Sequence, residues 1–222
     1  MTAGIGSSIV GLVVLTGLLS LMPLLVVTVT SFAKIAIVLF LVRNALGIQQ
    51  TPPNLVLYAA AIVLSAYVMA PVLQGVWAVV ADPRLPLASV ADWERAATEA
   101  ARPVRGFLDR HATPESRSFF IESSHRLWTP EQVRAMAGER DLAILVPSFL
   151  VSELKRAFEI GFLLYLPFVM VDLVVSSVLM ALGMQMMSPT VVSTPLKLLR
   201  FVAVDGWSRL LQGLILTYAP VA

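Results

Sequence analysis

The chain has 222 residues, of which 58% are hydrophobic and 14% are charged, and its formal net charge is +2. Soluble domains are about 45–50% apolar and about 25% charged, so this composition predicts a membrane protein. The absence of cysteine excludes disulfides, thiolate nucleophiles and cysteine-ligated metals. The small net charge, without a basic cluster interleaved with aromatic residues, does not indicate a nucleic-acid partner.

Charge is concentrated in the middle of the chain. Residues 82–141 carry 19 of its 30 charged side chains, and Thr129-Pro130-Glu131-Gln132 within them is typical of a helix start. We therefore divide the chain into an N-terminal hydrophobic helical hairpin (1–81), a charged insert (82–141) and a C-terminal hydrophobic hairpin with a Met-rich turn (142–222). The predicted fold class is an all-α membrane protein: two kinked helical hairpins joined by a charged, partly helical extracytoplasmic insert.

Four apolar segments reach the roughly 20 residues that a helix needs to cross the hydrocarbon core. They cover residues 9–42, 55–81, 142–182 and 196–219. The beginning of the chain lacks the basic region and the small-residue cleavage pattern of a secretory signal. We therefore expect the first segment to be a retained hydrophobic helix.

The few basic residues near the apolar segments predict an orientation. Arg43 follows the first segment, with Lys34 close by, and Lys197 and Arg200 lie at the start of the fourth; neither turn contains an acidic residue. By the positive-inside rule, both turns are expected in the cytoplasm. Four crossings would then place the insert and both termini outside the cytoplasm.

The third apolar segment begins with a helix that carries charges. A charge in hydrocarbon costs about 2.5–3.5 kcal/mol or more, so this helix is not expected to face lipid. One alternative is a solvated amphipathic helix at the membrane surface. The other is ion pairing between subunits of an oligomer, favoured by Ala157 and Gly161, which are one turn apart and allow helices to approach closely. The charged side chains fall within one half of the helical wheel and can pair at i,i+3 and i,i+4 spacing: Glu153, Lys155, Arg156 and Glu159.

Two further charges, Lys34 and Asp172, lie within apolar segments. An intramembrane carboxylate indicates a functional residue or an interhelical ion pair. Asp172 could relay protons, or it could pair across helices with Lys34 as the candidate partner. The structural pairing is the more frequent outcome.

The turn after the third segment contains Met184, Gln185, Met186 and Met187. Methionine is unbranched and polarizable, and it moulds to irregular surfaces. Three methionines on one turn could close a pore flexibly where several copies meet. Ordinary membrane packing is the alternative that the residues alone favour.

Residues suited to catalysis are scarce. His111 and His125 lie in the charged insert without a second ligand at metal-binding spacing. The chain has no phosphate-binding glycine loop and no nucleophile elbow. We therefore expect no enzymatic activity, no cofactor and no metal.

Two blocks of the sequence, residues 28–75 and 143–218, carry a series of ordered motifs. The first contains TSFAKI at 30–35, and the second contains SELKRAFEIG at 152–161. The chain resembles the type III secretion export-apparatus family called SctR or YscR, whose flagellar counterpart is FliP. The remaining matching motifs lie at 41–47, 50–54, 147–149, 167–168, 172–174, 180–184, 195–197 and 204–207.

The resemblance implies a place in an export gate at the bacterial inner membrane. Five copies are expected to assemble with SctS-like, SctT-like and SctU-like subunits, and the assembled complex is expected to protrude into the periplasm. By the same resemblance, the turn from Met184 to Met187 looks like a methionine gasket, although Gln185 departs from the flagellar pattern. The helix from Glu153 to Glu159 looks like part of an inter-subunit ion-pair network.

These observations lead to one main hypothesis and two rivals. The chain is interpreted as a pore-forming subunit that lines a channel for unfolded secreted proteins. It is expected to belong to a virulence-type system, because the flagellar proteins commonly carry a cleavable signal peptide and none is evident here. The main rival is an ion channel or a proton-coupled secondary transporter that uses Asp172. A membrane-embedded scaffold without a pathway is the third possibility.

Overall fold

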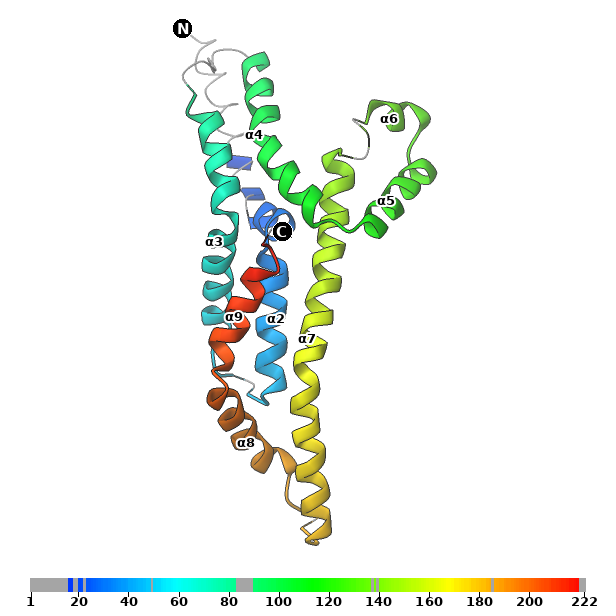
Figure 1. Ribbon diagram of the computed structural model, residues 1–222. Helices are drawn as coiled ribbons and strands as arrows, with labels where there is room; N and C mark the ends of the chain where they lie inside the picture. The colour runs from blue at the N-terminus through cyan, green and yellow to red at the C-terminus, as the bar shows by residue number, and fades with distance from the viewer. Residues whose placement is uncertain are drawn as a thin grey trace.

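The computed structural model describes residues 16–17, 20–21, 23–48, 50–82, 90–136, 138, 140–184 and 186–219, and it contains helices and no strand within them. This confirms the predicted all-α class. The start of the chain, where a retained helix is expected, lies largely outside the described residues. The helices labelled in Figure 1 are, in chain order, α2 (Phe32–Ala45), α3 (Asn54–Val80), α4 (Val90–His111), α5 (Pro114–Leu127), α6 (Pro130–Ala135), α7 (Leu142–Ala181), α8 (Pro189–Ala203) and α9 (Gly206–Leu216).

Helix α2 lies at the centre of the bundle (Figure 1). It packs against α7 on one side and against α3 on the other. Helix α7, with 40 residues, is the longest element, and α8 leaves its far end so that α9 turns back alongside α2. The first and last parts of the chain therefore share one core, and the boundaries 1–81, 82–141 and 142–222 stay a prediction.

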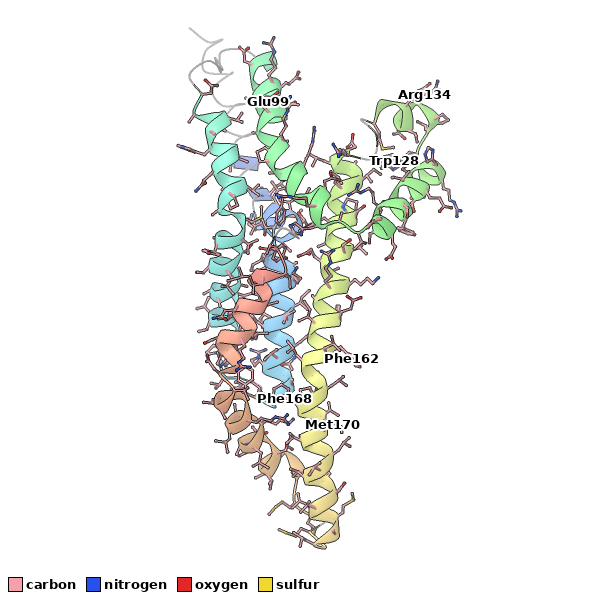
Figure 2. All side chains as sticks on the ribbon, in the orientation of Figure 1. Glu99, Trp128, Arg134, Phe162, Phe168 and Met170 are labelled. Carbon is pink, nitrogen blue, oxygen red and sulfur yellow. The ribbon has the colours of Figure 1, made fainter. Side chains whose placement is uncertain are left out.

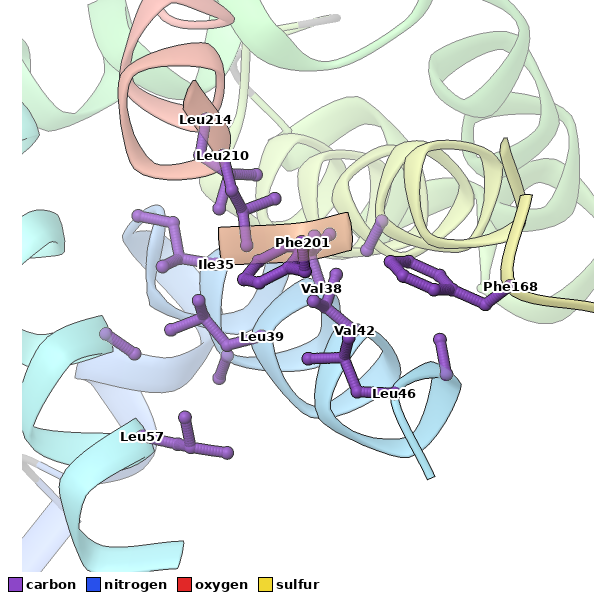
Figure 3. Packing of buried hydrophobic residues seen from close by; sticks show 14 residues of the cluster. Ile35, Val38, Leu39, Val42, Leu46, Leu57, Phe168, Phe201, Leu210 and Leu214 are labelled. Carbon is purple, nitrogen blue, oxygen red and sulfur yellow. The ribbon is translucent and has the colours of Figure 1, made fainter. Parts of the chain in front are cut away.

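The apolar core forms around one face of α2. Its buried residues between 35 and 46 recur at the three- and four-residue spacing of a helix face. Figure 3 shows side chains from α3, α7, α8 and α9 converging on this face. Each fully buried large side chain contributes about 1.5–3 kcal/mol. The labelled residues of this cluster are Ile35, Val38, Leu39, Val42, Leu46, Leu57, Phe168, Phe201, Leu210 and Leu214.

The close approach of α2 to α7 depends on small residues of α7. A Cβ atom added to Gly161 would lie 2.2 Å from Leu41 Cδ1 and 3.3 Å from Leu41 Cβ. Ala157, one turn earlier, is fully buried in the same core. The expectation that Ala157 and Gly161 serve contact between subunits is therefore wrong. They accommodate α2 of the same chain.

Among the described residues, two helices, α3 and α7, are long and apolar enough to cross a membrane. A third span would combine the helix at residues 23–29 with α2. These two helices are bent by 81° relative to each other. The fourth expected span, 196–219, is divided into α8 and α9, of 15 and 11 residues. Asp205 causes the division, because its left-handed backbone (φ 53°) cannot continue a helix. Length and composition of the described residues thus support two or three crossings, and the expectation that 196–219 forms a fourth is corrected.

Hydroxyl side chains occupy the bend that precedes α2. Ser31 Oγ donates to Ser65 Oγ over 3.0 Å, and Ser65 Oγ donates to Thr30 Oγ1 over 3.2 Å. Thr30 Oγ1 also accepts the backbone N–H of Phe32. A break in an apolar span frees backbone groups, which nearby hydroxyls can satisfy. The polar patch of the first segment therefore stabilises the bend.

The charged insert, for which the sequence predicts partly helical structure, contains helices. Helix α4 runs along α3, where Gly75 admits Pro103 so closely that a Cβ atom on Gly75 would lie 2.9 Å from Pro103 Cγ. The predicted start at Thr129 is confirmed, because Thr129 and Gln132 form a reciprocal capping box. Helices α5 and α6 extend away from the bundle beyond α7 (Figure 1).

We predict that Gly161→Leu weakens the packing of α2 on α7, because a side chain at this position overlaps Leu41. Overpacking of this kind typically costs about 1–3 kcal/mol, measurable as a lower thermal unfolding midpoint of the detergent-extracted protein. Gly213→Leu is the matched control, because a Cβ atom on Gly213 of α9 meets nothing within 4 Å. Equal midpoints for the two variants would contradict the packing role of Gly161.

Candidate functional site

A buried ion pair joins α2 to α7. Lys34 Nζ lies 3.3 Å from Glu153 Oε1, and both side chains are 0% exposed. Arg156 Nη1 lies 3.6 Å from the same oxygen, and the hydroxyl of Tyr218 donates to Glu153 Oε2. Both carboxylate oxygens of Glu153 are therefore engaged. We call Lys34, His111, Glu153, Arg156 and Tyr218 the Glu153 cluster.

Helix packing explains why Lys34 meets Glu153. The small residues Ala157 and Gly161 let α2 approach α7, and Glu153 lies one turn before Ala157 on the same face. An ion buried without a partner costs several kcal/mol, so the pair must form wherever the two helices bury it. Lys34 gains a second contact, because its Nζ lies 3.6 Å from the centroid of the Tyr218 ring.

The end of α4 covers the cluster. The His111 ring lies 4.7 Å from the Phe107 ring and 5.0 Å from the Tyr218 ring, measured between centroids. The backbone carbonyl of His111 accepts a hydrogen bond from Arg156. Burial lowers the pKa of His111 to about 4, and the positive charges of Lys34 and Arg156 act in the same direction. His111 is therefore neutral near pH 7.

The charged residues of α7 differ from their expected arrangement. Glu153 is fully buried and pairs with Lys34 of the same chain. The expected pair of Glu153 with Arg156 is present, whereas Lys155 lies 3.3 Å from Glu115 of α5 instead of pairing with Glu159. The inter-subunit ion-pair network of Glu153, Lys155, Arg156 and Glu159 stays a prediction.

A second ion pair joins α7 to α8. Lys197 Nζ lies 2.6 Å from Asp172 Oδ2 and donates to the backbone carbonyl of Ala45 over 3.1 Å. Lys34 is therefore not the partner of Asp172, and that expectation is wrong. Lys197 is almost fully buried and satisfies a carbonyl at the end of α2, where a cation is favourable. The pair thus ties three helices together.

The turn that joins α7 to α8 lies at the far end of this hairpin (Figure 1), and it contains the methionines. Gly183, with a φ of +72°, allows the chain to leave α7, and α8 begins after Ser188. Met184 and Met187 are 40% exposed and Met186 is 102% exposed. Gln185 lies outside the described residues. The methionines therefore do not pack into the core of this chain.

Sequence reasoning identified most of these polar groups but missed two members of the cluster. The sequence suggests His111 only as a candidate metal ligand, and it gives no signal for Tyr218. In the part of the chain that the structure describes, no group of three or more His, Asp or Glu could hold a metal. The site offers ion pairs that fix helices and an exposed apolar turn. No sequence signal links Tyr218 to Glu153, because 65 positions separate them.

Comparison with known proteins shows which family the chain resembles. The FliP family model matches residues 14–214. The chain is 53% identical over 211 residues to the probable translocation protein y4yL of Sinorhizobium fredii, covering 95% of each chain. It is 47% identical to the Yop proteins translocation protein R of Yersinia pestis, covering 94% of this chain and 96% of that one. It is 39% identical to the surface presentation of antigens protein SpaP of Salmonella typhi, covering 96% and 98% respectively.

We predict that His111 makes stability depend on pH between about 6.5 and 4. Its folded pKa lies below the unfolded value, so the unfolded chain takes up the proton first as the pH falls. The free energy of unfolding should therefore decrease from pH 6.5 to pH 4, and His111→Gln should remove that part of the decrease. Thermal unfolding across this range measures it. His125→Gln, which makes the same substitution at an exposed histidine of α5, is the matched control.

Proposed function

The chain belongs to the FliP family, in its type III secretion branch of SctR/YscR proteins, and from this premise we propose that it is a pore-forming subunit of the export gate. The relatives are translocation and secretion components, so the chain is a component of a protein secretion system. In the proposed role, several copies line a channel for unfolded secreted proteins. The subunit is non-enzymatic, and the energy for transport comes from elsewhere in the machine.

The observation that carries the proposal is the exposed methionine turn. Met184, Met186 and Met187 are held at the end of a helical hairpin and are exposed, Met186 completely. Flexible, unbranched apolar side chains of this kind can meet between copies and still yield to a passing polypeptide. We propose that the turn, including Gln185, forms a gasket that closes the channel when no substrate is present.

The apolar surfaces of the chain support an assembly in the inner membrane. Phe162 and Met170 project from α7 on the side away from α2 (Figure 2), and both are more than half exposed. Trp77 of α3 is similarly exposed. Such faces suit lipid or neighbouring subunits. We propose five copies of this chain with SctS-like, SctT-like and SctU-like subunits, in a complex that protrudes into the periplasm.

The rival function, ion or proton transport through Asp172, has less support. Asp172 contacts Lys197, and Lys197 in turn caps the end of α2. A carboxylate engaged in this way fixes the base of the α7–α8 hairpin. Its placement therefore favours a structural role, in which the hairpin holds the methionine turn in position.

We predict that replacing Met184, Met186 and Met187 together by Ala makes the resting assembly leak. Shorter side chains leave a gap where copies meet, so ion conductance should rise severalfold in cells or in proteoliposomes that contain the complex. Met170→Ala, which removes an exposed methionine from the side of α7, should leave conductance unchanged. An unchanged leak in the triple variant, with the complex present in normal amount, would contradict the gasket.

We predict that Asp172→Asn lowers the yield and thermal stability of the complex, because it leaves Lys197 buried without its counter-charge. The loss should lie below the about 3–5 kcal/mol of a fully buried pair, since Asp172 is partly exposed. Secretion per assembled complex should persist. The double variant Asp172→Leu/Lys197→Met should recover stability and secretion. A transporter that uses Asp172 would instead lose coupled transport in both variants at unchanged stability.

A further inference from the structure

The joint between α4 and α5 is attached to one short stretch of α7. The backbone N–H of Thr113 donates to Ser152 Oγ over 2.9 Å, and Arg156 donates to the carbonyl of His111 over 3.1 Å. Ser152 and Arg156 flank Glu153 on α7. The insert is thus fastened to the turn of α7 that carries the buried carboxylate, at the point where α5 diverges from the bundle (Figure 1).

The attachment of the insert depends on the hydrogen bonds that the Glu153 carboxylate accepts. Its side chain is 0% exposed, with Oε1 facing Lys34 and Arg156 and Oε2 accepting the hydroxyl of Tyr218. A charged group that loses a hydrogen bond while it stays buried pays the full cost of desolvation. Water can reach Glu153 only if one of the segments that cover it moves away.

Tyr218 follows α9 and contacts three other elements at once. Its ring lies beneath Lys34 of α2, and the centroids of the His111 and Phe107 rings of α4 lie 5.0 and 6.0 Å away. Its hydroxyl reaches Glu153 of α7. Burial and the neighbouring Glu153 carboxylate raise the pKa of Tyr218, so the hydroxyl keeps its proton and remains a donor. One side chain therefore packs under the insert and satisfies the carboxylate beside it.

We propose that Tyr218 is a positioning residue that holds the charged insert on α7 by donating its hydroxyl to Glu153. When that hydrogen bond is absent, the joint at residues 111–113 lifts from α7 and admits water to the carboxylate. The bundle formed by α2, α3 and α7 stays folded, because the apolar core around α2 contains no member of the Glu153 cluster. This inference concerns the insert and does not depend on the proposed function.

The chain contains no cysteine, so a single introduced thiol reports one opening event. Ala112 lies in the joint and is 5% exposed, and Ala112→Cys adds one atom at a site that insert opening uncovers. Ala61 of α3 is 0% exposed in the main core, and Ala61→Cys reports unfolding of the bundle. The rate of maleimide labelling in membranes that contain the full-length protein measures each opening.

We predict that Tyr218→Phe accelerates labelling of the thiol in Ala112→Cys about tenfold or more, the effect of losing a hydrogen bond to a charged group. Labelling of the thiol in Ala61→Cys should not change. The control Tyr67→Phe removes a hydroxyl from an exposed tyrosine of α3 and should affect neither rate. An unchanged rate at position 112, or equal acceleration at position 61, would overturn the proposal, the second because it indicates general loss of stability.

The same Tyr218→Phe substitution in a second variant background distinguishes the effect of the Tyr218 hydroxyl from the effect of ring packing. In Lys34→Met/Glu153→Leu, the buried pair is replaced by apolar side chains, a change that is often neutral or stabilising. Tyr218→Phe should then leave labelling of the Ala112→Cys thiol unchanged, since no carboxylate needs the hydroxyl. If Tyr218→Phe still accelerates labelling in this background, Tyr218 acts through packing alone and its assignment as a hydrogen-bonding positioning residue fails.

Discussion

The burial of Glu153 constrains the arrangement of every segment around it. A carboxylate that is 0% exposed between apolar helices needs a cation and hydrogen-bond donors, which Lys34, Arg156 and Tyr218 supply. Any other register of α2 against α7 would separate Lys34 from Glu153 and leave both ions buried alone. The pair therefore penalises misaligned packing more strongly than apolar contacts do, because apolar side chains tolerate small shifts.

A second pair fixes the other end of α2. Lys34 lies in the first turn of α2. Lys197 binds the carbonyl of Ala45, the last residue of α2, while it pairs with Asp172 of α7. A helix rises about 1.5 Å per residue, so the 11 positions from Lys34 to Ala45 separate the two anchors by about 16 Å along α2. Helices α2 and α7 thus form a rigid unit, with the charged insert attached near one end and the methionine hairpin near the other.

The sequence predicts the helices of this structure better than it predicts their contacts. Hydropathy identifies α2, α3 and α7, and Thr129 marks the start of α6, because these signals are local. The partner of Lys34 is 119 positions away, so no local pattern distinguishes Glu153 from Asp172 as that partner. Hydropathy does not indicate the break at Asp205, because it is averaged over many residues and one residue changes the average little. The pair Asp205-Gly206 is nevertheless typical of a turn.

The position of the methionine turn follows from how the hairpin is supported. Beyond Asp172, α7 buries only its inner side, with Val175 and Leu179, while Met186 at the tip is free. The salt bridge between Asp172 and Lys197 ties α8 to α7 at the base of this hairpin, and the turn joins the two helices at its tip. The proposed gasket needs a support of this kind. In that proposal the backbone presents each turn at a reproducible place, while the flexible methionine side chains adapt to a passing polypeptide.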